Sequence, residues 1–173
     1  MRRVIVGLFI IVIAAFSRLL PHPPNVTPLV AMALAGGVYF DKKYAFILPI
    51  LALVVSDIFL GFHATVPFVY GSFLMIVLLG VWLKSHKKVV TVAAGSIASS
   101  LFFFVVTNFG VWLTGGGWYY PKTLSGLVEC YVLALPFLQN ALLGDLAFTA
   151  VIFGLFEGVE YYLQSLKKVQ TER

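Results

Sequence analysis

The sequence predicts an all-α integral membrane protein: a compact bundle of six transmembrane helices forming a single domain over residues 1–173. Two observations lead to this prediction. Hydrophobic residues make up 61% of the chain and charged residues only 11%, whereas a soluble domain has about 25% charged residues. The apolar residues also fall into six segments, most of them close to the roughly 20 residues that span a hydrocarbon core. A single cysteine excludes an internal disulfide framework.

The six predicted helices cover about 4–20, 28–40, 44–62, 66–83, 89–114 and 133–157. The first resembles a signal peptide, but Arg18 follows its apolar core and no small-x-small cleavage site is present, so we expect a transmembrane helix. The second is short and rich in alanine and glycine, which lets a helix lie close against its neighbours without reaching both membrane faces. The stretch 115–132 is expected to be an outer loop, and its second half, 122–132, is a candidate surface helix.

The positions of lysine and arginine predict the orientation. Ten of the twelve lie at the N-terminus, in the loops 41–43 and 84–88, and in the C-terminal tail, whereas Arg18 and Lys122 lie on the opposite side. The positive-inside rule then places both termini in the cytoplasm. We expect a multi-pass protein of the inner membrane. No basic stripe is interleaved with aromatic residues, which excludes a nucleic-acid partner. Membrane lipid is the expected surrounding.

Polar side chains inside the apolar segments gather toward the outer ends of the helices, beneath the long outer loops. Ionisable groups at membrane depth normally face protein or a water-filled cavity. The sequence therefore predicts an outward-facing pocket for a small-molecule substrate, with room for a ligand beside Asp145 because Gly144 is small. The predicted substrate-binding residues are Arg18, Asn25, Asp57, His63, Tyr70, Asn108, Trp112, Trp118, Asn140 and Asp145.

Other interpretations of these residues stay open. Arg18 could neutralise Asp57 or Asp145 as a structural partner, and the asparagines could join helices by hydrogen bonds. The pairs Gly95/Ser99 and Ser96/Ser100 are typical of close helix packing. The two aspartates also resemble the pair of an intramembrane hydrolase, but Leu142 stands where the Gly-x-Gly-Asp signature needs its first glycine. We therefore expect no enzyme. A structural membrane partner without a ligand is the remaining alternative.

Several motifs resemble a bacterial family regarded as transport proteins, itself similar to the membrane-embedded substrate-binding subunits (S components) of energy-coupling-factor vitamin transporters. The resemblance covers about Arg18 to Phe156. The motifs are Leu19-Leu20-Pro21-His22-Pro23-Pro24-Asn25, Ser56-Asp57 through Gly61-Phe62-His63, Asn108-Phe109-Gly110-Val111-Trp112-Leu113, Tyr120-Pro121-Lys122-Thr123-Leu124, and Asn140 through Leu143-Gly144-Asp145.

The resemblance implies an S-component-like bundle that takes up a vitamin or a similar cofactor precursor. It also implies an energising module (a T subunit and ATPases) as a partner, although the first helix lacks the Ala-x-x-x-Ala pattern with which S components dock to a shared module. No resident cofactor or metal is expected. Solitary members of the wider group ligate cobalt through a side chain, and His22, His63 and Cys130 are the weak candidates here if the ligand carries cobalt.

Overall fold

The computed structural model describes residues 9, 12–13, 16–18, 20–21 and 23–171, and the regular structure in these residues is entirely helical. Five helices have defined bounds: α2 (Leu29–Tyr39), α3 (Lys42–Leu60), α4 (Val66–Leu83), α5 (Val89–Thr114) and α6 (Leu124–Thr171). The all-α prediction is therefore confirmed. Residues 9, 12–13 and 16–18, which belong to the predicted first helix, are helical, and the rest of that segment lies outside the described residues.

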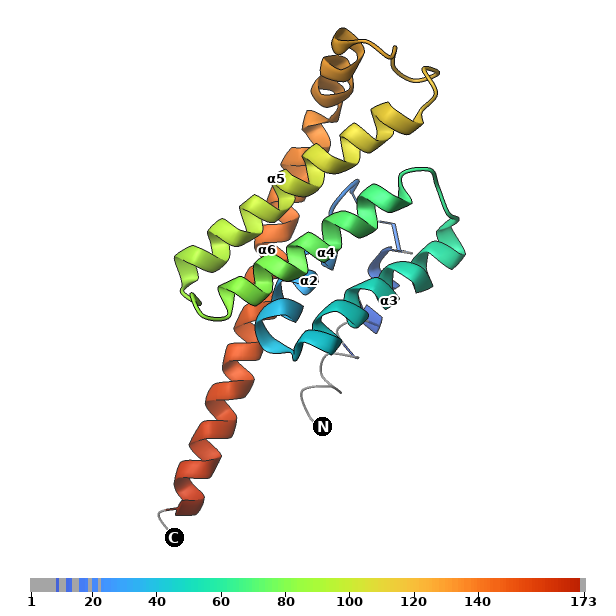
Figure 1. The fold of residues 1–173 in the computed structure, drawn as a ribbon. Coiled ribbons are helices and arrows are strands. Elements are labelled where there is room, and N and C mark those ends of the chain that lie inside the picture. Colours follow the sequence, from blue (N-terminus) through green and yellow to red (C-terminus); the bar gives the residue numbers. More distant parts are fainter. Residues whose placement is uncertain (1–8, 10–11, 14–15, 19, 22, 172–173) are drawn as a thin grey trace.

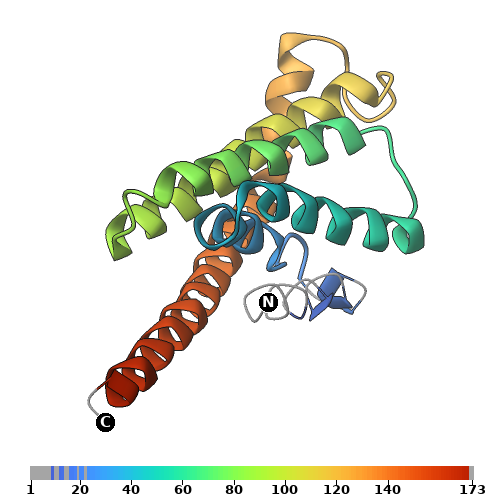
Figure 2. The same ribbon diagram turned by 60° about the horizontal axis from the view of Figure 1, so that its bottom comes forward.

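The short helix α2 forms the centre of the molecule. All of its 11 residues are buried, and it contacts α3, α4, α5 and α6. Figures 1 and 2 show α2 between α4 on one side and α6 on the other. A helix that is apolar on every side must be covered on every side, and this is why the other helices surround it.

The smallest residues of α2 allow this close packing, as the sequence predicts. At Gly37 and Gly80 the backbones of α2 and α4 cross so closely that a Cβ atom on either glycine would clash with backbone atoms of the other helix. The predicted contact of a small-residue helix with its neighbours is therefore confirmed, and Gly80 of α4 is the matching partner on the other side.

Helix α6 corrects the predicted boundary between outer loop and last helix. It is one helix of 48 residues, Leu124–Thr171, so the predicted loop 115–132 ends at Thr123 and the predicted surface helix is the first part of α6. Thr123 starts the helix because its hydroxyl accepts a hydrogen bond from the Gly126 amide at 3.2 Å, an N-cap contact. Pro136 lies inside the helix without ending it.

The length of α6 carries it beyond the rest of the bundle. At 1.5 Å per residue it is about 72 Å long, more than twice the roughly 30 Å of a hydrocarbon core. Its C-terminal part extends past the other helices (Figures 1 and 2).

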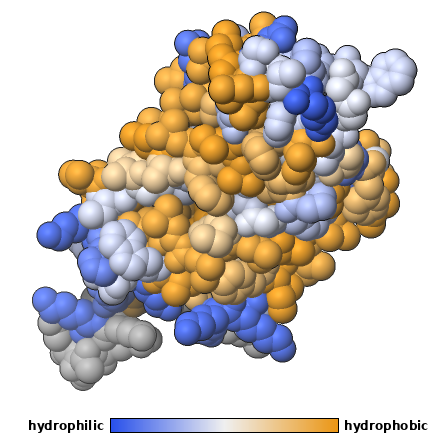
Figure 3. Space-filling model, turned by 45° about the horizontal axis from the view of Figure 1, so that its top comes forward, coloured by the Kyte–Doolittle hydropathy of each residue, from blue (hydrophilic) through white to orange (hydrophobic). Residues whose placement is uncertain are grey.

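Among the described residues, four helices are long and apolar enough to cross a membrane: α3, α4, α5 and the part of α6 within Leu124–Leu166, whereas α2 is too short. Large apolar side chains are exposed along these helices, and Figure 3 shows a broad hydrophobic surface with hydrophilic residues gathered toward its edges. Such a surface suits lipid rather than water and indicates a membrane protein. We call the end with the loops 61–65 and 115–123 the loop end and the end with the loop 84–88 the lysine end.

Candidate functional site

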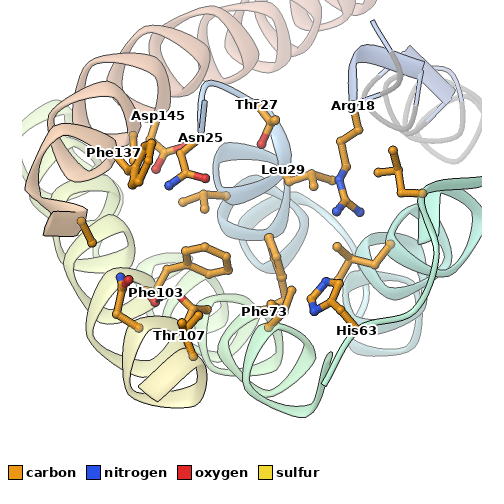
Figure 4. Close-up of a pocket in the computed structure, with 18 of the residues that line it drawn as sticks. Arg18, Asn25, Thr27, Leu29, His63, Phe73, Phe103, Thr107, Phe137 and Asp145 are labelled. Atoms are coloured by element: carbon orange, nitrogen blue, oxygen red, sulfur yellow. Dashed lines mark hydrogen bonds between the residues drawn. The ribbon is translucent and has the colours of Figure 1, made fainter. Parts of the chain in front are cut away.

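A cavity of about 530 Å³ lies at the loop end of the bundle. It is bordered by the segment that precedes α2 and by all five helices, and its walls are mainly apolar with polar groups between them (Figure 4). The lining residues are Arg18, Asn25, Thr27, Leu29, Val30, Leu53, Leu60, His63, Val69, Phe73, Phe103, Thr107, Asn108, Val111, Tyr120, Leu133, Ala134, Phe137, Ala141 and Asp145.

Arg18 forms a buried ion pair at one side of the cavity. Its Nη1 atom lies 2.8 Å from Oδ1 of Asp57 and donates to the Ser56 hydroxyl at 2.6 Å. Tyr70 of α4 donates to the other carboxylate oxygen of Asp57 at 2.9 Å. Asp57 is only 2% exposed and Arg18 is 18% exposed. The cluster therefore ties Arg18, which precedes the proline-rich loop (residues 21–28), to α3 and α4. Of the residues in this cluster, only Arg18 lines the cavity.

Asp145 stands at the other side of the cavity, on α6. It is 2% exposed, and its Oδ2 atom accepts a hydrogen bond of 2.6 Å from Ser100 of α5. One turn deeper, Thr149 of α6 donates to the Ser96 hydroxyl of α5 at 3.0 Å. The serines that the sequence assigned to close packing are buried at this interface, and they also supply the hydroxyl contacts of α6.

The proline-rich loop before α2 places Asn25 in the cavity. Asn25 has a positive φ of 63°, and the Val26 amide bonds back to the Pro23 carbonyl at 3.1 Å. Proline followed by a residue with positive φ, closed by this bond, is the pattern of a type II turn. Asn140 of α6 donates to the Pro24 carbonyl at 3.2 Å, which ties the turn to α6. Asn140 thus positions the loop and does not line the cavity.

Gly144 has a different role from the predicted one. A Cβ atom at this position would lie 3.1 Å from the Val26 side chain. The space beside Gly144 is therefore filled by the loop and not left for a ligand. The glycine lets the proline-rich loop lie directly on α6, beside Asp145.

The loop 115–123 is held at its base by Trp112 and Lys122. The Trp112 indole donates to the Pro121 carbonyl at 3.0 Å, and Lys122 donates to the carbonyls of Trp112 and Leu113 at the end of α5. These contacts bring Tyr120 to the cavity. Burial raises the pKa of the Tyr120 phenol, with a further rise from Cys130 and Glu129, so it stays a neutral hydrogen-bond donor. Trp118 points away, with 93% of its surface exposed.

Two of the three weak metal candidates, His63 and Cys130, lie in the described part of the chain. The described part of the chain contains no group of three His, Cys, Asp or Glu side chains that could hold a metal ion. His63 lines the cavity, with Nδ1 lying 2.6 Å from the Thr65 hydroxyl. Cys130 is a free, buried thiol that donates to the Asn108 carbonyl at 3.4 Å. His22 lies outside the described residues.

The ten predicted site residues separate into four groups. Arg18, Asn25, His63, Asn108 and Asp145 line the cavity. Asp57 and Tyr70 reach it through Arg18, whereas Trp112 and Asn140 hold its loops and Trp118 lies outside. The structural alternative is right for the Arg18–Asp57 pair. Among the described hydrogen bonds neither asparagine side chain joins two helices, because the Asn108 amide donates to Phe104 of its own helix and the Asn140 amide donates to Pro24 of the loop before α2. Asp57 and Asp145 have separate partners, and no hydrogen bond joins these two described residues.

Sequence reasoning missed Thr27, Thr107 and Tyr120, as well as the apolar walls. The helical spacing of Phe103, Thr107 and Val111, each four residues apart, is a signal that could have found one wall, because residues at this spacing share a helix face. Phe73 of α4 and Phe137 of α6 complete the aromatic part of the lining.

The comparisons with known proteins give one match. A model of a family of unknown function (DUF6580) matches residues 1–166. None of the curated proteins matches the chain, and none of the solved structures does. The match covers the cavity and all of the helices up to residue 166.

Proposed function

Since the chain belongs to this family of unknown function, we propose its function from the geometry of the cavity. The protein is a membrane transport protein that binds a small molecule, about the size of a vitamin or cofactor precursor, in the cavity at the loop end. The volume of about 530 Å³ lies in the range of small-molecule sites, roughly 300–1,000 Å³, and apolar walls with a few converging polar groups are typical of such sites.

One observation carries the proposal: polar groups from distant parts of the chain meet at one cavity. Arg18 and Asn25 precede α2, Asn108 comes from α5 and Asp145 from α6. Buried polar groups are costly unless they have partners. The buried polar side-chain atoms among the described residues all have hydrogen-bond partners, so the proposal is supported by the convergence of these groups on one cavity with apolar walls, the arrangement typical of small-molecule sites.

The membrane topology is the second part of the proposal. The chain crosses the bacterial inner membrane six times, α2 and the segment before it included, so that both termini and the lysine end face the cytoplasm. The cavity then opens outward, as the S-component resemblance implies. Asn25 and Thr27 before α2 and Tyr120 of the loop 115–123 border it on the outer side, and α2, whose residues are all buried, lies at the centre of the bundle.

The test uses a variant that fills the cavity and a matched variant that does not. Ala141 lines the cavity, whereas Leu143, two residues further along α6, is 73% exposed. We expect a small molecule to be released when gently purified wild-type protein is denatured, and mass spectrometry identifies it. The same molecule should be present in Leu143→Phe and absent from Ala141→Phe.

Transport is then measured with the identified molecule. Proteoliposomes that contain this protein alone are compared with membrane vesicles of the source cells, which supply any energising module. Uptake in either system, lost in Ala141→Phe, is the expected result. Equal release of the molecule from wild type and Ala141→Phe, or the release of none, would contradict the proposed function.

A further inference from the structure

Asp145 is a carboxylate that lines the cavity without a cationic partner among the described residues. It is 2% exposed, and its hydrogen bond from Ser100 comes from a neutral hydroxyl. The described ion pairs within 4.0 Å join Arg18 to Asp57 and Lys87 to Glu157 and Glu160. A buried carboxylate with only neutral neighbours costs several kcal/mol, so a positively charged group of a ligand would be stabilised beside Asp145.

The other charges at the cavity do not supply it. The charge of Arg18 is balanced by Asp57 at 2.8 Å, and Tyr120 stays neutral. Figure 4 shows Arg18 and His63 on one side of the cavity and Asp145 with Asn25 on the other. Among the described lining residues, the carboxylate of Asp145 is therefore the charge without a counterion. The side-chain amide of Asn25 lies on the same side of the cavity (Figure 4) and adds hydrogen-bonding groups there.

The remaining walls suit an apolar or aromatic body. Phe137 lies beside Asp145, and Phe73 and Phe103 lie between the two polar sides (Figure 4). Aromatic faces attract cations as well as apolar groups, so this lining disfavours an anion throughout.

We propose that the ligand of this cavity is a small organic cation, an inference that rests on the proposed function. Its positively charged nitrogen contacts the Asp145 carboxylate, and its apolar or aromatic body lies against Phe73, Phe103 and Phe137. The other end of the ligand is polar but uncharged, and it lies at the side of the cavity with Arg18 and His63.

The test measures equilibrium binding of radiolabelled benzylamine, a monocation at neutral pH, to the protein in nanodiscs, with empty nanodiscs as the blank. Unlabelled benzylamine, benzyl alcohol and benzoate, which share the ring and differ in charge, are the competitors. We expect saturable binding that benzylamine displaces at least tenfold better than either other compound, since a charge-assisted hydrogen bond contributes about that factor or more.

Two variants test whether Asp145 is the carboxylate that binds the cation. Asp145→Asn should weaken benzylamine binding at least tenfold, whereas Glu160→Gln, which removes a carboxylate at the lysine end, should leave it unchanged. Equal displacement by benzoate or benzyl alcohol, or no saturable benzylamine binding to wild type, would overturn the cation inference. These competition results do not depend on the folding of any variant.

The two proposals can fail separately. A released molecule without a positive charge, present in wild type and absent from Ala141→Phe, overturns the cation inference and leaves the proposed function standing. The absence of any molecule and of any probe binding sensitive to Ala141→Phe overturns both.

Discussion

Breaking the buried ion pair between Arg18 and Asp57 is expected to destabilise the fold strongly. Asp57 is 2% exposed in the intact pair, and in Arg18→Met its carboxylate keeps Tyr70 as a donor but loses its cationic partner. Removing one partner of a buried ion pair costs about 3–5 kcal/mol. Asp57→Asn leaves a charge that is 18% exposed and borders the cavity, so we expect a smaller loss of about 1.5–3 kcal/mol.

The double variant separates a pair from two independent residues. Arg18→Met with Asp57→Asn leaves no buried charge at this position, so its loss should be smaller than the sum of the single losses, with a coupling energy of about 2–3 kcal/mol. The assay is reversible unfolding in mixed detergent micelles, which gives the free energy of unfolding for each variant.

The matched control is the ion pair of Lys87 and Glu157 at the lysine end, whose side chains are 33% and 51% exposed. Exposed ion pairs contribute about 0–1 kcal/mol, so the coupling energy of Lys87→Met with Glu157→Gln should fall in this range. Additive losses for Arg18 and Asp57, within the error found for this control, would refute the assignment of the pair as a structural anchor.

Three further predictions concern the packing, the turn and the topology. Gly80→Ala should lower the free energy of unfolding by about 3 kcal/mol because its Cβ would meet the backbone of α2, whereas Gly71→Ala, with open space around it, should raise it by about 0.5–1 kcal/mol; unfolding in detergent measures both. Asn25→Val should lower the free energy of unfolding by about 1–2 kcal/mol because the residue has a positive φ. Asn25→Gly should keep the stability and weaken only the binding of the released molecule. Equal stability of the Val and Gly variants would argue against the strained turn. A cysteine at Gly116 should react with an impermeant thiol reagent on intact cells and one at Ser85 should not, since Cys130 is buried and gives little background; labelling at Ser85 would reverse the proposed orientation.

The helices could be predicted largely because their signals are local. The apolar runs of α4 and α5 end at the predicted residues, and the alanines and glycines of α2 indicated its close packing. The start of α6 could not be placed in this way, since the segment 124–132 has no glycine or proline near its end to separate it from the following apolar run. Pro136 lies inside α6, and a proline inside a membrane helix is tolerated where neighbouring groups satisfy the freed backbone.

The cavity could be predicted in part, because depth in the membrane follows from position in each helix. That estimate places Arg18, Asn108 and Asp145 in the outer half of the bundle. It could not tell which side of a helix each residue faces, so Asn140 and Trp112, in the same half, were expected in the cavity although they bind the loops. The contact of Ser100 with Asp145 depends on how α5 and α6 pack, which only the tertiary structure determines.

Native mass spectrometry of the protein released from mild detergent tests the central claim most directly, because it counts ligands on the folded chain. The cavity-based account predicts that a fraction of wild-type and Leu143→Phe protein carries one additional mass of a small molecule, and that Ala141→Phe carries none. The same added mass on Ala141→Phe, at the same occupancy, would contradict the claim that this cavity is the binding site.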